Sequence, residues 1–552
     1  MRIDNAKLKS GEDLQFGDFN VFVGGNGVGK TTIVSEVFDK ISAANGSKYL
    51  WIDQLSHSAN DVTADLKLLK KSLAHQREGA SLFYLSSATK GIGGNIDLDG
   101  SLRFSEGEVA QMESVTDASI FNTPKYRRPF ITFSSCESRL TFPDGAGLTG
   151  LDQPPSDALN VLFRDGGLME DISDHIHRRF GYYLVLIDHT FTALKVGISH
   201  TKPPDFDRNA RDKQSASDKV RKWEEEHLIP ITKAGHGIRS MVKLLTALLE
   251  PVNQIIIIDE PELHLYPSQK RWFGYQLALL ASTQNKQIFL VTHDASILQG
   301  IFEGSANTHL FRVNKDNHGV GTVRSCQLPK QSISHSKNQH QYLQGLFYQR
   351  CVVVEGSSDR LFYETLFNDY PKVQDKDLGF IACSGTGNAK NVASMVAQIG
   401  LKASFIFDLD VLVDKRDLIQ EVYETLGGEG HPLQRLETIL MSNPSVRAAP
   451  INKKNAAIKK LTGYTKKNGF STQWMAANRR VVMGCLNKLE SVGIFIVPRG
   501  DLESWAPQVR NKIDFAELAP DIIRQNILLD KELKVFAKKV LKWIDINIGR
   551  KT

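Results

Sequence analysis

The 552-residue sequence predicts an α/β protein built from two successive domains, 1–345 and 346–552. Three observations support this. Near the N-terminus, the stretch FNVFVGGNGVGKTTIVSEVF has the pattern of an apolar strand, a glycine loop and a helix. More than 200 residues later, QIIIIDE has the pattern of a buried strand that ends in acid. After residue 345 the alternation of apolar strand and helix restarts, which indicates a second α/β domain.

The composition is that of a globular protein, because 41% of the residues are hydrophobic and 24% are charged. No apolar run approaches the roughly 18 residues that a membrane span requires. The N-terminal MRIDNAKLKS lacks the apolar core of a signal peptide. The five cysteines include no CxxC pair, which argues against a disulfide framework and a structural zinc site. We therefore expect a cytoplasmic protein without a membrane partner.

The net charge of +6 is unevenly distributed along the chain. Residues 441–552 contain 21 Lys+Arg and 9 Asp+Glu, a balance of +12; the totals of 68 and 62 then leave 47 and 53, or −6, for residues 1–440. A basic end on an acidic body suggests that a polyanion binds at that end. A solvated basic surface is the alternative.

The glycine loop of the first domain fits the phosphate-binding pattern, with Gly24-x4-Gly29-Lys30-Thr31 between a strand and a helix. In such loops the backbone N–H groups surround the phosphates, the lysine reaches the β and γ oxygens, and the hydroxyl binds Mg²⁺. We therefore predict an ATP site. Its expected nucleotide-binding residues are Gly24, Asn26, Gly27, Gly29, Lys30, Thr31 and Thr32.

The acidic strand supplies the second half of this site. Asp259 is expected to hold Mg²⁺ through water, and Glu260 to orient or deprotonate the attacking water. The next apolar strand, KQIFLV, is soon followed by His293, which can contact the γ-phosphate region. A purely structural histidine is the alternative.

The order of these motifs resembles ATPase heads of the ABC/SMC type, with an insertion at about 85–225 that is a candidate dimerisation region. The resemblance implies a serine–glycine signature that completes the partner subunit's site. The candidate is Gly235-His236-Gly237-Ile238-Arg239-Ser240, with Gly237 and Ser240 as the nucleotide-binding residues, although the usual leading Leu-Ser and double glycine are missing. The working unit would then be a homodimer or a dimer of dimers.

In the second domain several apolar strands end in acid. CVVVE ends at Glu355, SFIFDLD at Asp408 and Asp410, and GIFIVPRGDLESW at Asp501 and Glu503, whereas GFIACS ends at the turn SGTGN. The carboxyl ends of parallel strands share one edge of a sheet. We therefore expect five carboxylates at one rim: Glu355, Asp359, Asp408, Asp410 and Glu503.

Crowded carboxylates repel one another unless a cation joins them. Ligand sets made only of oxygen favour Mg²⁺ or Mn²⁺. Two such ions close together can cleave phosphodiesters. The alternative is that these acids cap helices or face solvent.

A glutamate–glycine motif, an Asp-x-Asp motif and a final glutamate together resemble the Toprim domain, a Rossmann-like α/β fold. An ABC-type ATPase followed by a Toprim domain resembles the OLD (overcoming lysogenisation defect) family, which includes the Gabija ATPase–nuclease and retron-associated effectors. The resemblance implies a metal-dependent DNA endonuclease, gated by its ATPase head, that acts in anti-phage defence. It also implies a trigger encoded nearby, such as a helicase or a retron reverse transcriptase with its DNA.

The same resemblance implies roles for individual residues. Asp408 and Asp410 would be the principal metal ligands, and Glu503 would complete a second metal site. Glu355 and Asp359 would bind one metal or act as general base, with Asp414 and Asp501 in reserve. The family places a basic residue near the scissile phosphate, and this sequence offers Arg499.

Residues 447–480 contain nine Lys/Arg and no Asp/Glu, interleaved with Tyr464, Phe470 and Trp474. Paired basic residues neutralise phosphates, and aromatic side chains stack on unpaired bases. A solvated helix whose aromatic residues belong to the core is the alternative. The expected nucleic-acid contacts here are the doublets Lys453-Lys454, Lys459-Lys460 and Lys466-Lys467.

Two other functions are compatible with these motifs. One is a Toprim ribonuclease that cuts RNA such as tRNA, because the metal chemistry is the same and contacts to the 2′-OH cannot be recognised in a sequence. The other is a non-cleaving, SMC-like DNA-repair ATPase, for which five rim carboxylates would be unnecessary.

Overall fold

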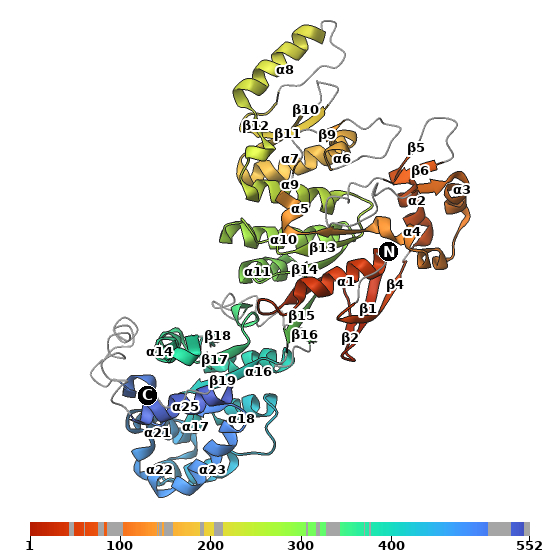
Figure 1. Ribbon diagram of the computed structural model, residues 1–552. Helices are drawn as coiled ribbons and strands as arrows, with labels where there is room; N and C mark the ends of the chain where they lie inside the picture. Colours follow the sequence, from red (N-terminus) through yellow and green to blue (C-terminus); the bar gives the residue numbers. More distant parts are fainter. Residues whose placement is uncertain are drawn as a thin grey trace. The chain divides into compact units, whose positions relative to one another are not determined.

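The computed structural model (Figure 1) describes two compact units, Met1–Val323 and Arg324–Thr552. The boundary after residue 345, expected from the motifs, remains a prediction. The described residues are 1–42, 49–59, 61–75, 82–85, 103–140, 142, 146–147, 158–187, 193–203, 213–304, 307–315, 321–326, 343–368, 370–374, 377–505 and 531–545.

The first unit is organised around a six-stranded sheet of order β16-β15-β3-β14-β13-β8. The strands β15, β3, β14, β13 and β8 run parallel to their neighbours in this order. Their carboxyl ends therefore share one edge, as the sequence predicted for the glycine loop and the acidic strand. The bounds are β3 (Phe19–Val23), β8 (Ile131–Ser134), β13 (Ile255–Asp259), β14 (Gln287–Val291), β15 (Thr308–Lys315) and β16 (Gly321–Cys326).

Helices cover this sheet through apolar faces. In α1 (Lys30–Ser42), Ile33, Val34 and Val37 are buried at helical spacing and belong to the core of the unit. The helix α9 precedes β13, and α10 and α11 flank β14 along the chain. Their bounds are α9 (His236–Leu249), α10 (Pro267–Thr283) and α11 (Ala295–Gly304).

Smaller elements complete the first unit. One antiparallel sheet joins β1 (Arg2–Leu8), β2 (Asp13–Gln15) and β4 (Ile52–Ser58), and another joins β5 (Leu73–His75), β6 (Leu82–Leu85) and β7 (Arg103–Ser105). A third contains β9 (Ala146–Gly147), β10 (Tyr183–Ile187), β11 (Ala193–Ser199) and β12 (Ile229–Pro230). The helices are α2 (Val62–Ser72), α3 (Glu106–Ser114), α4 (Pro124–Arg127), α5 (Cys136–Leu140), α6 (Ala158–Arg164), α7 (Gly166–Phe180) and α8 (Lys213–His227).

The second unit contains a four-stranded parallel sheet of order β18-β17-β19-β20. This confirms the second α/β domain. The strands are β17 (Arg350–Val354), β18 (Leu378–Ala382), β19 (Lys402–Phe407) and β20 (Ile494–Ile496). Around them lie α14 (Ser357–Asn368), α15 (Pro371–Gln374), α16 (Ala389–Gln398) and α25 (Lys531–Trp543).

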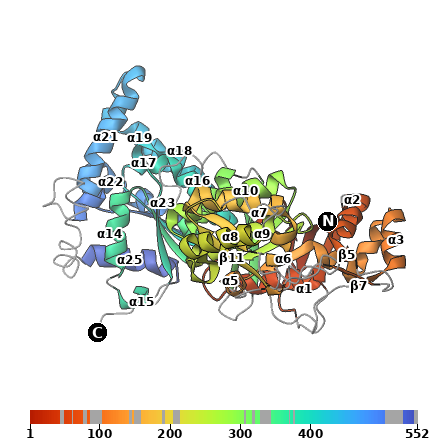
Figure 2. The same cartoon turned by 90° about the horizontal axis from the view of Figure 1, so that it is seen from above.

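A helical segment separates β19 from β20 and contains the basic stretch. Figure 2 shows α21 reaching out beyond the other helices of the second unit. The segment consists of α17 (Val411–Asp414), α18 (Arg416–Thr425), α19 (Gln434–Ser442), α20 (Pro444–Arg447), α21 (Lys454–Asn468), α22 (Gln473–Ala477) and α23 (Arg479–Glu490).

Within the described residues, no helix is both long and apolar enough to span a membrane.

A buried carboxylate ties the helix after the glycine loop to the neighbouring sheet. Glu36 on α1 is 5% exposed, and its oxygens accept hydrogen bonds from the backbone N–H groups of Leu50, Trp51 and Ile52 at the start of β4. Backbone donors that lose their partner in the interior are costly. Glu36 therefore fixes the strand entry that places Trp51 against the glycine loop.

We expect Glu36→Ala to lower the free energy of unfolding by about 3 kcal/mol, because unsatisfied buried donors cost about 1–3 kcal/mol each. Urea denaturation followed by tryptophan fluorescence measures this, and hydrogen exchange of β4 gives a local readout. Ser35→Ala on the same helix is the control. Equal stability of the two variants would contradict the assigned role of Glu36.

Candidate functional site

The glycine loop between β3 and α1 has a backbone that requires glycine at two positions. The φ angles of Gly24 and Gly29 are +148° and +103°. A Cβ at Gly24 would lie 2.3 Å from the carbonyl oxygen of Val313, and one at Gly29 would lie 2.7 Å from the ring of Trp51. Side chains at either position would therefore force the loop apart. Asn26 and Gly27 are exposed in the middle of the loop.

Lys30, the first residue of α1, closes this loop. Its side-chain Nζ donates hydrogen bonds to the carbonyl oxygens of Gly24 (3.0 Å) and Gly25 (2.8 Å). Burial lowers the pKa of the ammonium, while the charges of Glu260, Asp259 and Glu262 oppose this shift. A buried ammonium at the start of a helix suits an anion such as a nucleotide phosphate.

The structure brings together Thr31 and Asp259, the two residues predicted to hold the Mg²⁺ of the nucleotide. Thr31 Oγ1 donates to Asp259 Oδ1 at 3.0 Å, although the residues lie 228 positions apart. Burial raises the pKa of Asp259, and the hydrogen bond from Thr31 opposes that shift. A hydroxyl and a carboxylate in contact can share one Mg²⁺. Thr32, the next residue of α1, is half-buried.

Glu262, which was not predicted from the sequence, contacts His293 together with Glu260. The His293 Nδ1 atom lies 3.3 Å from Glu260 Oε1 and 3.2 Å from Glu262 Oε1. Glu262 is 2% exposed and also accepts from Thr292 Oγ1 and from the His293 N–H, both at 2.8 Å. Burial raises the pKa of Glu262. The spacing Glu260-x-Glu262 after the strand was the available signal, and it places two carboxylates on one imidazole nitrogen.

Arg139, on α5, connects the acidic strand to the candidate signature helix. The residue is 1% exposed, and its guanidinium donates to Ser240 Oγ (3.0 Å), the Asp259 carbonyl (2.9 Å) and the Glu260 carbonyl (2.8 Å). Ser240 is itself buried and faces Arg139, and a Cβ at Gly237 would lie 2.9 Å from the His264 carbonyl. The contact of Gly237 and Ser240 with a partner subunit's nucleotide remains a prediction.

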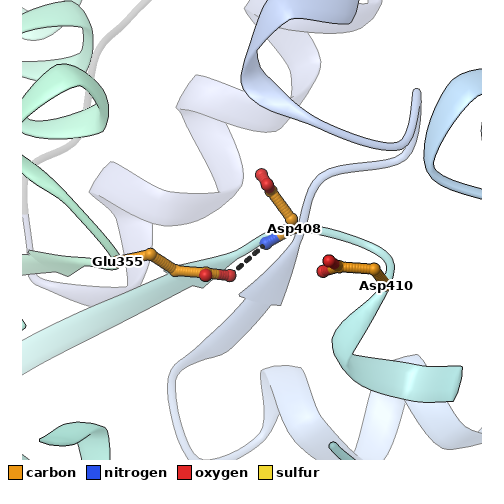
Figure 3. A group of neighbouring side chains, drawn as sticks. All are labelled: Glu355, Asp408 and Asp410. Carbon is orange, nitrogen blue, oxygen red and sulfur yellow. Dashed lines mark hydrogen bonds between the residues drawn. The ribbon is translucent and has the colours of Figure 1, made fainter. Parts of the chain in front are cut away.

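In the second unit, three of the predicted rim carboxylates form one cluster. One ligand oxygen from each of Glu355, Asp408 and Asp410 lies within 4.8 Å of the others (Figure 3). Glu355 follows β17, whereas Asp408 and Asp410 follow β19, its parallel neighbour. The predicted convergence of strand ends explains this cluster.

The chemistry of the cluster fits a divalent cation. Glu355 Oε1 accepts from the Asp408 N–H at 2.9 Å, and Asp410 Oδ1 is buried without a hydrogen-bond partner among the described residues. Burial, followed by the charge of Asp408, raises the pKa of Glu355. Oxygen ligands of this kind, one of them an unpaired acceptor, suit Mg²⁺ or Mn²⁺.

The basic residue beside these carboxylates is Lys466, from the last turn of α21. Its Nζ lies 2.9 Å from Asp408 Oδ2 and 3.6 Å from Asp410 Oδ2. Burial disfavours the ammonium, but Asp408, Asp410 and Asp501 outweigh it and raise the pKa of Lys466. Arg499, which the resemblance suggested for this position, pairs with Glu532 at 2.9 Å.

The remaining rim residues have other surroundings. Asp359 Oδ2 accepts from the Gly356 N–H at 2.9 Å, which caps the start of α14, and Asp359 does not belong to the three-residue cluster. Burial and the charge of Asp410 raise the pKa of Asp414. Asp501 is half-buried. The side chain of Glu503 lies outside the described part of the chain.

The basic segment presents lysines on one face of α21. Lys459, Lys460 and Lys467 are exposed, as is Lys453 just before the helix, and Lys454 is half-buried. Tyr464 is 55% exposed, whereas Trp474 is 8% exposed and donates from Nε1 to Thr465 Oγ1 at 3.1 Å. Phe470 is half-buried. Of the aromatic residues, Tyr464 can reach a ligand and Trp474 belongs to the core.

Comparison with known proteins gives two family matches. Residues 180–298 match an AAA ATPase domain, and residues 346–410 match the Toprim domain of overcoming-lysogenization-defect-like proteins. The Old nuclease of Escherichia phage P2 is 24% identical over 300 residues, which cover 50% of this chain and 49% of that protein. These matches confirm the resemblance predicted from the motifs.

The OLD nuclease of Thermus scotoductus is 25% identical over 210 residues, which cover 35% of this chain and 39% of that protein. The chain thus spans half or less of the length of these curated relatives. A crystal structure of an SMC head bound to the C-terminal winged-helix domain of ScpA matches with 14% identity and a TM-score of 0.34, covering 60% of this chain and 99% of that chain. The fold assignment rests on the sheets above and not on this similarity.

Replacing Lys466 by Met would leave Asp408 and Asp410 without their cation. We expect Lys466→Met to lower the unfolding free energy of the metal-free protein by about 2 kcal/mol. The variant should gain more stability from Mn²⁺ than the wild type does, because the metal then relieves the repulsion. Thermal unfolding in EDTA and along a Mn²⁺ titration measures both effects.

The exposed neighbour Lys467→Met is the matched control for this experiment. If Lys466→Met and Lys467→Met were equally stable in EDTA, Lys466 would not be the counter-ion of the two aspartates.

Proposed function

From a chain that joins an AAA ATPase domain to an OLD-like Toprim domain, we propose a divalent-metal-dependent DNA endonuclease that is regulated by its ATP-binding head. The cluster of Glu355, Asp408 and Asp410 carries this proposal. Three carboxylates gather at the edge of a parallel sheet, and one buried oxygen among them has no hydrogen-bond partner within the described residues. A bound divalent cation would offset the repulsion that Lys466 only partly relieves. The names of the curated relatives, both nucleases, support the reaction class.

Glu355, Asp408 and Asp410 would hold Mg²⁺ or Mn²⁺, with Glu503 and Asp359 as further ligands. The bound cation would supply an activated water and stabilise charge on the phosphate. Lys466 contacts Asp408 at the same rim, and its ammonium would bind an oxygen of a nucleic-acid phosphate. The exposed lysines of α21 would continue this contact along the strand.

The ATP site would act as the regulator. Lys30 and the loop N–H groups would bind the triphosphate, and Thr31 and Asp259 would hold its Mg²⁺. Glu260 would receive the proton of the attacking water, beside His293. Nucleotide-dependent assembly of a homodimer, or of a dimer of dimers, would then control access to the Toprim rim.

The biological role follows from the resemblance to OLD-family effectors. We place the protein in anti-phage defence, held at a low basal activity until a trigger protein or nucleic acid binds. Cleavage of RNA is the competing substrate class, because the rim chemistry is shared by both polymers. Parallel cleavage assays on plasmid and on RNA separate the two.

Purified protein with Mg²⁺ or Mn²⁺ is expected to cut supercoiled plasmid and to leave RNA intact, and Asp408→Ala is expected to abolish cutting. Lys30→Ala should remove the response of cutting to ATP while Mn²⁺ still stabilises the protein. Gel assays with and without ATP, combined with thermal unfolding in Mn²⁺, give both readouts.

Cutting that survives in Asp408→Ala would come from a contaminant or another site, and would contradict the metal role of the rim. Cutting of RNA but not plasmid would replace the DNA proposal with the ribonuclease.

Charge reversal on α21 tests the nucleic-acid contact. We expect Lys459→Glu, Lys460→Glu and Lys467→Glu together to weaken DNA binding and to reduce the slope of log affinity against log salt by about 0.9 for each phosphate that is no longer neutralised. Fluorescence anisotropy with a labelled duplex at several salt concentrations measures this. Lys531→Glu and Lys538→Glu, exposed on α25, are the control. An unchanged slope in the α21 variant would rule out this surface.

A further inference from the structure

The turn SGTGN after β18 contains a non-glycine residue with positive φ and lies next to the carboxylate cluster. Ser384 has φ +58° and Gly385 has φ +104°. The turn is attached to the end of β17, because the Gly385 N–H donates to the Glu355 carbonyl at 2.8 Å. Strained backbone persists where its surroundings hold it, and it gathers at functional sites. Here it buries the side chain of Thr386, which is 2% exposed, beside Glu355.

The hydroxyl of Thr386 links a lysine to the carboxylate of Glu355. Thr386 Oγ1 donates to Glu355 Oε2 at 2.9 Å, and Lys415 Nζ donates to Thr386 Oγ1 at 2.6 Å. An ammonium can only donate, and a hydroxyl has a single proton to give. Hydrogen-bond donation therefore runs in one direction, from Lys415 to Thr386 and from Thr386 to Glu355.

The hydrogen-bond relay Lys415–Thr386–Glu355 orients the Oε2 atom of Glu355, whose Oε1 atom is oriented by another bond. Glu355 Oε1 accepts from the Asp408 N–H at 2.9 Å, so both oxygens of Glu355 are oriented by neighbours. Each carboxylate oxygen has two acceptor positions. Within the described residues, these bonds leave one acceptor position on each oxygen for a further ligand, and they oppose rotation of the carboxylate about its terminal bond.

The two lysines at the rim act on different carboxylates. Lys466 lies directly on Asp408 and approaches Asp410. Lys415, the C-cap residue that follows α17, instead contributes its charge to Glu355 through the Thr386 hydroxyl. The charge of Lys415 stabilises the Glu355 carboxylate without taking a ligand position.

We propose that Thr386 and Lys415 are positioning residues that hold Glu355 in place for a divalent cation shared with Asp408 and Asp410. This inference rests on the proposed metal role of the cluster. Partners of this kind, which touch the ligand and not the metal, set the orientation of the ligand, and their loss typically lowers metal affinity or activity about 10–100-fold.

The test compares Thr386→Val, Thr386→Ser and Lys415→Met in the full chain. Mn²⁺ affinity is measured by electron paramagnetic resonance, and plasmid cleavage gives kcat and KM. Thr386→Val keeps the shape and removes the donor, so Mn²⁺ affinity should fall about 10–100-fold and kcat should fall while KM for DNA is retained. Thr386→Ser should restore both. Lys415→Met should act in the same direction, and the Thr386→Val/Lys415→Met double variant should be no worse than Thr386→Val alone.

The matched control is Thr365→Val on α14, a half-buried threonine whose hydroxyl donates to the Leu361 carbonyl at 2.8 Å. It should bind Mn²⁺ like the wild type. If Thr386→Val also did so, the positioning role would be overturned while the proposed nuclease remained. A wild type that neither binds Mn²⁺ nor cuts would overturn the proposed function itself. Circular dichroism checks folding, and if Thr386→Val unfolds, an unchanged Mn²⁺ affinity in Lys415→Met overturns the inference.

Discussion

The arrangement of the strand ends in the second unit depends on the hydrogen bonds of the Glu355 carboxylate. Its own strand is β17, its Oε2 accepts from Thr386 after β18, and its Oε1 accepts from the Asp408 N–H after β19. One side chain thus joins the ends of three parallel strands. Asp408 and Asp410 lie next to it, so three negative charges gather at the rim. Lys466 offsets the charge of the two aspartates, whereas Lys415, through Thr386, and the backbone N–H of Asp408 offset the charge of Glu355.

The first unit solves a related problem with different groups. Asp259, Glu260 and Glu262 gather at the end of β13, and the compensating charges are the Lys30 ammonium and the buried Arg139, whose guanidinium donates to the backbone carbonyls of Asp259 and Glu260. The side chains therefore stay available: Asp259 to Thr31, and the two glutamates to His293. In both units the scaffold is a parallel sheet whose strand ends collect acids. The placement of the cation decides which oxygens remain open to a ligand.

The strand ends were predictable from the sequence, because apolar runs that end in acid need only the rule that parallel strands share an edge. That rule was enough for the contact of Thr31 with Asp259 and for the cluster of Glu355, Asp408 and Asp410. The identity of the inward-facing lysine was not predictable. It depends on the rotation of α21, whose buried Ile458, Thr462 and Thr465 turn Lys466 toward the aspartates and leave Lys467 in solvent. Glu262, in contrast, could have been predicted, because it follows β13 two residues after Glu260 and His293 follows the parallel neighbour β14.

The ion pair of Lys466 with Asp408, and its approach to Asp410, make this ammonium an intramolecular competitor for any cation at the rim. The ammonium is tethered to the same chain, so its local concentration at the aspartates does not change with the concentration of protein or of salt cations. A divalent cation that bound through Asp408 would compete with this ammonium, and the competition would weaken the apparent affinity of the cation by a factor that does not depend on protein concentration. Under the proposed function, the same exchange would free the Lys466 ammonium when the carboxylates bind a metal. Metal binding and the release of a phosphate-binding group would then be coupled.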